Sequence, residues 1–237
     1  MSEYGLTFGA VADDYERARP QYADEALGWL AGRLPVERVL DLAAGTGKLT
    51  RQLLALGASV VAVEPDAAMR ATFERVVPGV EVLAGNAEAI PLADASVDSV
   101  FVGQAFHWFR TEAALAEMHR VVRPGGGFGL LWNTWRDDDP VLGPIDELLE
   151  QVRPLEVARR RELFETDLFG PREQRSFRQV RTMTTDAIVA WVASTSAGVN
   201  APAPERAALI GQVRELAGRW PVEVSIGTDV VVADRVS

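Results

Sequence analysis

The sequence predicts an α/β protein whose core is a doubly wound, mostly parallel sheet of seven strands. Continuous apolar runs at 39–42 and 60–63 are typical of parallel strands that are buried on both faces. Between these two runs, four leucines recur at helical spacing: Leu49, Leu53, Leu54 and Leu56. The same alternation of strand and helix continues along the chain, which favours the α/β class.

The remaining elements follow from the same patterns. Further strands are predicted at 80–84, 97–103, 128–132, 173–183 and 222–236. Further helices are predicted at 22–33, 66–76, 111–122, 184–196 and 203–218. We expect the last strand to be an antiparallel strand at the edge of the sheet. The two helices that precede it would form a helical insertion near the C-terminus.

Composition limits the kinds of partner. The chain has 237 residues, no cysteine and a formal net charge of −10. The lack of cysteine excludes disulfides, thiolate nucleophiles and zinc sites with cysteine ligands. Because phosphate binding depends largely on Lys and Arg, the negative charge argues against nucleic acid, and we expect a small-molecule partner. No membrane-spanning apolar stretch or secretion signal is present, so we expect a cytoplasmic protein without membrane contact. The sequence indicates no oligomeric state.

The chain is organised around the segment 39–64, VLDLAAGTGKLTRQLLALGASVVAVE. A strand enters a turn that contains Gly45 and Gly47, and a second strand ends on Glu64, where such units place an acid against a ribose. A dinucleotide-binding turn requires a third glycine, which position 50 lacks. A phosphate loop fails twice, since Leu42 and Leu49 stand where glycine and Ser or Thr are required. The pattern that remains is D-x-x-x-G-x-G followed by an acid.

Four more segments follow in order: VVAVEPD, GNAEAIPL, the A-x-H-W loop at 105–108, and RPGG. Together with VLDLAAGTG they resemble the motifs of the Rossmann-like, class I S-adenosylmethionine-dependent methyltransferases, across roughly residues 10–135. The resemblance is nearest to the small-molecule branch that includes trans-aconitate and ubiquinone-biosynthesis methyltransferases. Ala43 stands where many members carry the first glycine, and Asn86 stands where they carry an acid.

The resemblance implies one domain, 1–237, with three parts: an N-terminal lid helix region (1–34), a cofactor-binding core (35–135), and a C-terminal half (136–237) with a helical cover on the acceptor side. It implies S-adenosyl-L-methionine as the cofactor. Within YERARPQY (15–22), Arg19 would meet the carboxylate of the cofactor as a bidentate partner. The expected cofactor-binding residues are Tyr15, Arg19, Asp41, Ala43, Gly45, Thr46, Gly47, Glu64, Pro65, Met69, Asn86, Ala87, Glu88, Gln104 and Ala105.

The acceptor side is less defined by the sequence. His107 is either a general base or a residue of the pocket wall. His119 lies near the end of its helix, where we expect a structural role rather than a catalytic one. The expected substrate residues are Tyr22, Trp108, Asn133, Arg136 and Trp191. For Trp191, a position in the hydrophobic core explains the sequence pattern equally well. The acids at 137–139 fit the N-terminus of a helix better than a metal site, so we expect no metal.

The implied activity is transfer of a methyl group to a small-molecule acceptor. If the acceptor group is a carboxylate, the reaction needs no general base. Two other classes stay open from the residues alone. A non-catalytic cofactor-binding relative is suggested by Ala43 and Asn86, and an NAD-dependent dehydrogenase is disfavoured by the missing third glycine.

Overall fold

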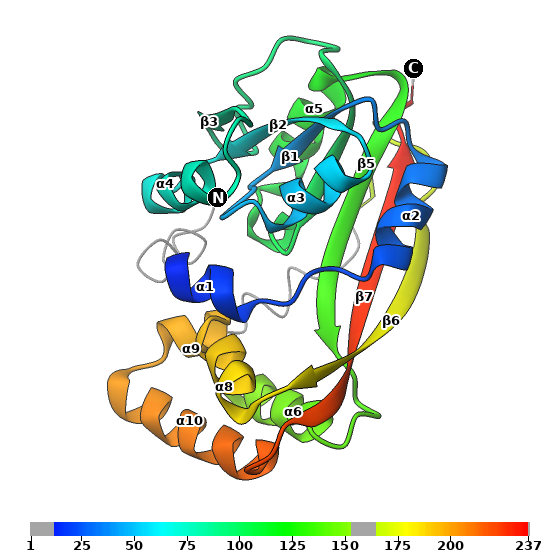
Figure 1. Cartoon of the computed structure of the whole chain (residues 1–237). Coiled ribbons are helices and arrows are strands. Elements are labelled where there is room, and N and C mark those ends of the chain that lie inside the picture. The colour runs from blue at the N-terminus through cyan, green and yellow to red at the C-terminus, as the bar shows by residue number, and fades with distance from the viewer. Residues whose placement is uncertain (1–11, 153–164, 237) are drawn as a thin grey trace.

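A seven-stranded mixed sheet forms the centre of the computed structural model, which describes residues 12–152 and 165–236 (Figure 1). The strands run in the order β3-β2-β1-β4-β5-β7-β6, and β7 is antiparallel to both of its neighbours. The predicted fold class is confirmed. The strand bounds are β1 Arg38–Leu42, β2 Ser59–Glu64, β3 Val82–Ala84, β4 Val97–Gly103, β5 Val122–Trp135, β6 Glu173–Met183 and β7 Val222–Asp234.

The last strand differs from its prediction in one respect: β7 is not at the edge of the sheet. It pairs with β5 on one side and with β6 on the other, so β6 is the edge strand. The burial of the two strands gives the reason. Residues 230–233 of β7 are buried in succession, as in a strand covered on both faces, whereas β6 is mostly exposed.

Helices cover both faces of the sheet. On one face, α2 (Asp24–Arg33) and α3 (Lys48–Ala55) share a hydrophobic cluster with β1, β4, β5 and β7. On the same face, α4 (Ala67–Val76) packs its Phe73 against Ala62 of β2. The opposite face is covered by α5 (Thr111–Val121), whose apolar side packs in the largest cluster. This arrangement leaves the carboxyl ends of β1, β2 and β4 accessible between the two layers.

The remaining helices gather at the far end of β5, where Figure 1 shows them as a separate group below the sheet. They are α6 (Leu142–Val152), α8 (Thr185–Ala193), α9 (Ser196–Asn200) and α10 (Ala203–Ala217), and α6, α8, α9 and α10 share a third hydrophobic cluster with the start of β7. The helix predicted at 184–196 is divided, because the Thr195 side chain accepts a hydrogen bond from Gly198 N and so begins α9.

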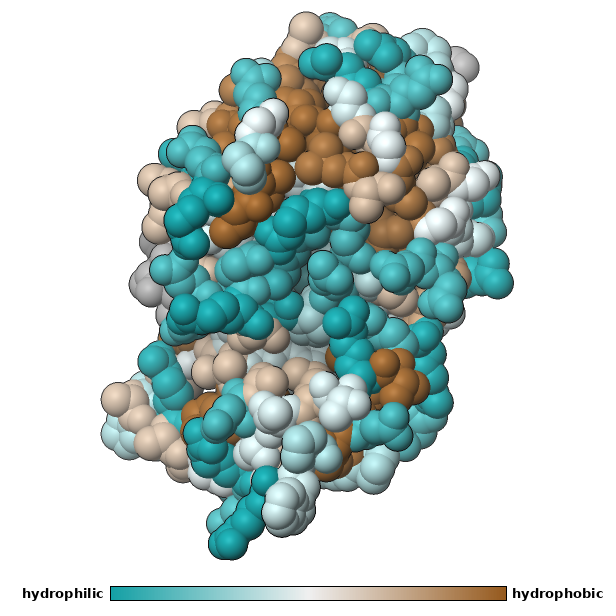
Figure 2. Space-filling model, in the orientation of Figure 1, coloured by the Kyte–Doolittle hydropathy of each residue, from teal (hydrophilic) through white to brown (hydrophobic). Residues whose placement is uncertain are grey.

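A short helix not predicted from the sequence, α1 (Ala12–Ala18), lies between the sheet and the C-terminal helices (Figure 1). The space-filling view shows a hydrophilic band across this middle region of the molecule (Figure 2). Residues 1–11 of the predicted lid region and 153–164 of the C-terminal half lie outside the described residues. Within the described ranges, no helix combines the length and apolar character needed to cross a membrane.

Candidate active site

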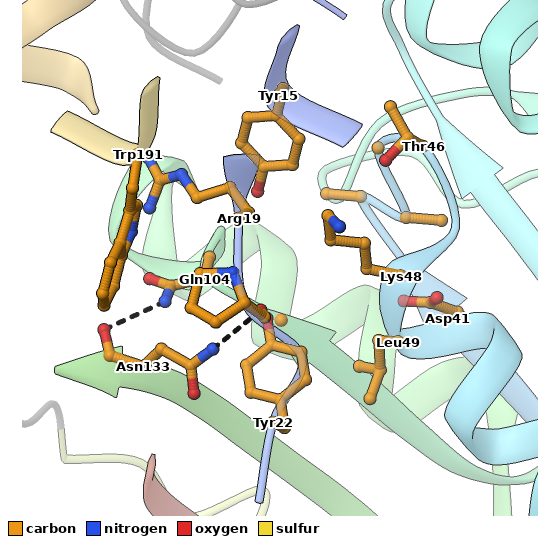
Figure 3. A pocket seen from close by; sticks show the side chains of 15 residues that line it. Tyr15, Arg19, Tyr22, Asp41, Thr46, Lys48, Leu49, Gln104, Asn133 and Trp191 are labelled. Carbon is orange, nitrogen blue, oxygen red and sulfur yellow. Dashed lines mark hydrogen bonds between the residues drawn. The ribbon is translucent and has the colours of Figure 1, made fainter. Parts of the chain in front are cut away.

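A cavity lies beneath α1, at the carboxyl ends of β1, β4 and β5 (Figure 3). Strand order reverses between β1 and β4, and open α/β sheets bind ligands at such a switch point. The lining combines the glycine turn, the segment around α1, the tips of β4 and β5, and one residue of α8. It consists of Tyr15, Arg19, Pro20, Tyr22, Asp41, Ala43, Ala44, Gly45, Thr46, Lys48, Leu49, Gly103, Gln104, Asn133 and Trp191.

The turn after β1 needs left-handed backbone at three residues: Ala43 (φ +58°), Gly45 (φ +57°) and Gly47 (φ +84°). At Gly45 a Cβ would meet nothing within 4 Å, so backbone is presented directly to the cavity. At Gly47 a Cβ would lie 2.6 Å from Val77 and 2.7 Å from Phe73. Gly47 is therefore required by packing against α4, while Gly45 leaves room for a ligand.

Asp41 is an acid with an unused oxygen in the cavity wall. It is 1% exposed; Oδ2 accepts a 2.5 Å hydrogen bond from Thr50, while Oδ1 has no partner among the described residues. Burial raises the pKa of this carboxyl to about 7, against the lowering effect of the Thr50 hydrogen bond. A buried carboxylate oxygen without a partner, such as Asp41 Oδ1, is suited to accept a hydrogen bond from a bound ligand.

Glu64 ties the glycine turn to the tip of β2. Its Oε2 accepts from Gly45 N and its Oε1 from Asp66 N, each at 2.9 Å. Burial raises the pKa of Glu64 to about 7, and the two backbone hydrogen bonds oppose that rise. Each carboxylate oxygen keeps a second lone pair, so ribose hydroxyls can still be accepted there.

Other predicted cofactor residues lie outside the cavity lining, near the tips of β2, β3 and β4. Glu64 pairs with Ala84 in the sheet, which brings the turn at 85–89 beside the tip of β2. In that turn, Asn86 Oδ1 already accepts from Glu88 N at 3.0 Å, so the side chain serves the local turn and keeps one lone pair for a ligand. Pro65 also lies at the β2 tip, and buried side chains complete this region: Met69, Ala87 and Ala105.

The segment predicted to be a lid contributes three residues to the cavity lining: Tyr15, Arg19 and Pro20. Glu16 of α1 accepts hydrogen bonds of 2.5 Å from both Thr46 and Arg51, and lies 3.8 Å from the Lys48 ammonium. At the other end of the segment, Arg19 donates from Nε to Ser194 Oγ (3.0 Å) and from Nη2 to Ser194 O (2.8 Å). One seven-residue helix and its extension thus connect the glycine turn with α8.

Arg19 uses part of its guanidinium for contacts within the protein. Ser194 holds the edge that carries Nε and Nη2, and the other edge, formed by Nη1 and the second N–H of Nη2, can still meet a carboxylate as a bidentate partner. Sequence reasoning missed Glu16 altogether, and it considered Lys48 only as part of a failed phosphate loop. Gln104 is in the cavity as expected, with a strained φ of +59° and a hydrogen bond from Nε2 to Asn133 O.

The predicted substrate residues divide into three groups. Tyr22 and Trp191 line the cavity. Asn133 also lines it, but its amide is committed: Nδ2 donates to the Pro20 and Gln21 carbonyls, and Oδ1 accepts from Thr228. Trp108 and Arg136 do not line this cavity: the Trp108 ring is part of the hydrophobic core, and Arg136 pairs with Asp138 and lines a separate, open pocket.

His107 is 9% exposed, lies in the short 3-10 helix η2 (Phe106–Trp108), and is absent from the cavity lining. Its imidazole is tilted against the Trp108 ring, with centroids 4.5 Å apart. A general base must reach the proton that it removes, so this position does not favour the base role.

The acids at 137–139 serve structure. Asp139 accepts from Val141 N and Leu142 N at the start of α6 and from Ser225 N at the start of β7. Capping by an acid satisfies free N–H groups and favours the positive end of the helix. Across the part of the chain that the structure describes, no group of three or more His, Cys, Asp or Glu side chains could hold a metal ion.

Known proteins with the same features are methyltransferases. A model of the methyltransferase domain matches residues 40–130. An uncharacterized methyltransferase of Mycobacterium tuberculosis is 40% identical over 222 residues, which cover 92% of this chain and 88% of the relative. A malonyl-[acyl-carrier protein] O-methyltransferase of Methylococcus capsulatus is 37% identical over 132 residues, 52% of this chain and 48% of the relative.

The fold is shared with solved structures as well. A candidate type II methyltransferase from Anaeromyxobacter dehalogenans superposes with a TM-score of 0.68 at 24% identity, covering 92% of this chain and 97% of that one. The fold is therefore Rossmann-like. The chain belongs to the class I S-adenosylmethionine-dependent methyltransferases.

Proposed function

We propose that the protein binds S-adenosyl-L-methionine across the tips of β1, β2 and β4 and methylates a small-molecule acceptor, with a carboxylate as the favoured acceptor group. The observation that carries the proposal is the covered cavity at the switch point, closed by α1 through Glu16 on one side and Arg19 on the other. The enclosed volume is about 40 Å³, far less than a site for a whole cofactor requires, so α1 must move aside when the cofactor binds. A site covered in this way suits a small ligand rather than a macromolecular surface.

The residues present fit this cofactor. The unpartnered Asp41 Oδ1 can accept from an ammonium group, and the open space at Gly45 allows close approach to the backbone. Glu64, with a free lone pair on each oxygen, is placed for ribose hydroxyls, and the turn containing Asn86 lies beside it for the base. When bound, the cofactor supplies a methyl group on a sulfonium sulfur that leaves as a neutral thioether.

The chain's contribution to the reaction is positioning and exclusion of water. α1 covers the cavity, Asp41 and the glycine turn hold one side, and Arg19 and Trp191 form the other. No base is required for a carboxylate acceptor, which is already ionised at neutral pH, so the position of His107 outside the lining is no obstacle. That a relative is named as an O-methyltransferase supports an oxygen acceptor.

The charge of the protein supports the same class of acceptor. A net charge of −10 disfavours polyanions such as nucleic acid, whereas Arg19, which lines the cavity beside α8, provides a local positive charge for one small anion. The other cation of the lining, Lys48, faces Glu16. A protein that bound the cofactor without transferring its methyl group would have the same fold, so catalysis must be tested directly.

The test uses the full chain and two measurements. Calorimetry with S-adenosylmethionine should show binding that Glu64→Ala greatly weakens. Transfer of a labelled methyl group should then be followed by mass spectrometry over a panel of small carboxylic acids, phenols and amines. Binding without transfer to any compound would support the non-catalytic alternative, and transfer only to phenols or amines would refute the carboxylate part of the proposal.

A further inference from the structure

One wall of the cavity carries a hydrogen-bond donor that the cofactor assignment does not use. Trp191 is 1% exposed and lines the cavity, and its indole Nε1–H has no hydrogen-bond partner among the described residues. A buried N–H without a partner is unfavourable. Among the described residues Trp132 has a second such indole N–H, but Trp191 is the one of the two that lines the cavity. A ligand atom in the cavity would supply the missing acceptor.

The orientation of the Trp191 indole is fixed by its neighbours. One face stacks on Trp135 of β5, with centroids 4.0 Å apart and an angle of 18° between the rings. The main chain at Trp191 is held as well, because Ser194 Oγ donates to its carbonyl at 2.7 Å. A donor on a rigid, stacked ring is prepared for a ligand in one position, which lowers the entropy cost of binding.

The charge around this wall selects the kind of ligand. Ser194 also fixes Arg19, so the guanidinium and the Trp191 indole lie side by side (Figure 3). Across the cavity, next to the glycine turn, lies the buried acid Asp41. Lys48 lines the same side, but its ammonium lies 3.8 Å from Glu16, and Glu64 is buried behind the turn, where it accepts from Gly45 N. The cavity is therefore polarised. The acidic side suits the ammonium and ribose of a cofactor, and the side formed by α8 suits an anionic oxygen.

We propose that Trp191 is a specificity-determining residue whose indole N–H hydrogen-bonds a carboxylate oxygen of the methyl acceptor, with Arg19 supplying the neighbouring positive charge. A carboxylate has two oxygens, so one can accept from Nε1–H while the other faces the methyl donor. The inference rests on the proposed function, since it assigns a substrate contact in the same site.

The test compares two tryptophan substitutions in the full chain loaded with S-adenosylhomocysteine. Trp191→Phe keeps an aromatic ring against Trp135 and removes the N–H. The control, Trp132→Phe, removes another buried N–H without a described partner, on a tryptophan that packs in the main core and does not line the cavity. The ligands are acetate, malonate, succinate, citrate and benzoate, each paired with its primary amide, and affinities are measured by calorimetry.

We expect at least one acid to bind the wild type more tightly than its amide. We expect Trp191→Phe to weaken that acid about tenfold, the usual effect of losing a hydrogen bond to a charged group. The affinity for S-adenosylhomocysteine should stay within about twofold, well below the effect of a lost hydrogen bond. Trp132→Phe should change neither affinity.

A second measurement needs no stable variant at this position. In wild-type protein with ¹⁵N-labelled tryptophan, one indole N–H resonance should shift when the acid is added and not when the amide is added. The proposal is overturned if none of the acids binds, if no indole resonance responds, or if Trp191→Phe weakens S-adenosylhomocysteine as much as the acid. Failure of the proposed function itself is distinct, because it would appear as a wild type that does not bind S-adenosylhomocysteine.

Discussion

Replacing each of the two glycines of the turn after β1 by alanine should have different effects on stability and on ligand affinity. Both have left-handed backbone, which costs an alanine about 1–2 kcal/mol. At Gly47 the new methyl group would also overlap Val77 and Phe73, at 2.6 and 2.7 Å. Overpacking of this kind adds about 1–3 kcal/mol. Gly47→Ala should therefore lose about 2–5 kcal/mol of stability in all. Gly45→Ala should lose only the cost of the left-handed backbone, about 1–2 kcal/mol.

Thermal unfolding and calorimetry separate the two effects. For a chain of this size, the melting temperature should fall by about 4 °C for Gly45→Ala and by about 10 °C for Gly47→Ala. Binding of S-adenosylhomocysteine, measured well below both transitions, should be weakened at least about tenfold by Gly45→Ala, because its methyl group occupies ligand space. Gly47→Ala should largely keep its affinity, since Gly47 faces α4 and does not line the cavity.

Gly57→Ala is the matched control, because Gly57 has a φ of +88°, has no neighbour within 4 Å of a Cβ, and lies in the turn after α3. It should show the loss of stability of Gly45→Ala without the loss of affinity. Equal losses of affinity in the Gly45 and Gly47 variants, or a smaller loss of stability at Gly47 than at Gly45, would refute the reasoning.

Three further predictions concern charged and titrating groups. Burial raises the pKa of Asp41 to about 7, so the stability that its neutral form provides is complete below about pH 4 and lost as the pH rises through about 7. Asp41→Asn should partly flatten this fall in the melting temperature of the ligand-free protein; an unchanged profile would contradict it. Glu16→Gln should weaken cofactor binding about threefold to tenfold by loosening α1, whereas Asp14→Asn, in an exposed pair on the same helix, should not. His107→Asn should leave the pH dependence of turnover unchanged, and loss of the acidic limb of the pH profile in this variant would restore His107 as a base.

The strand–helix–strand unit that contains the glycine turn could be predicted because its signals are local. The continuous apolar strands β1 and β2, the leucines of α3 and the two turn glycines all lie within 39–64. The place of β7 could not be predicted in the same way, because it depends on pairing with β6, about forty residues earlier in the chain, whose polar, exposed character marks the true edge. Periodicity identifies a strand but not its neighbours.

The directions of side chains on the acceptor side could not be predicted from the sequence. Asn133 lines the cavity, and its amide also holds Pro20 and Gln21, more than a hundred residues away in sequence. Trp108 lies in the predicted loop, and its ring is buried in the core. In both cases the direction of the side chain is set by contacts with residues that are distant in the sequence.

The short helix α1 connects the two halves of the site more closely than its size suggests. A seven-residue helix is too short to be stable on its own in water, so its order depends on its contacts. Those contacts reach both sides of the cavity: Glu16 binds Thr46 and Arg51 beside the cofactor turn, and Arg19 binds Ser194 beside Trp191. Any ligand that orders the glycine turn or the end of α8 therefore also stabilises α1. We therefore expect cofactor and acceptor to favour each other's binding through this helix, in addition to their direct contact at the methyl group.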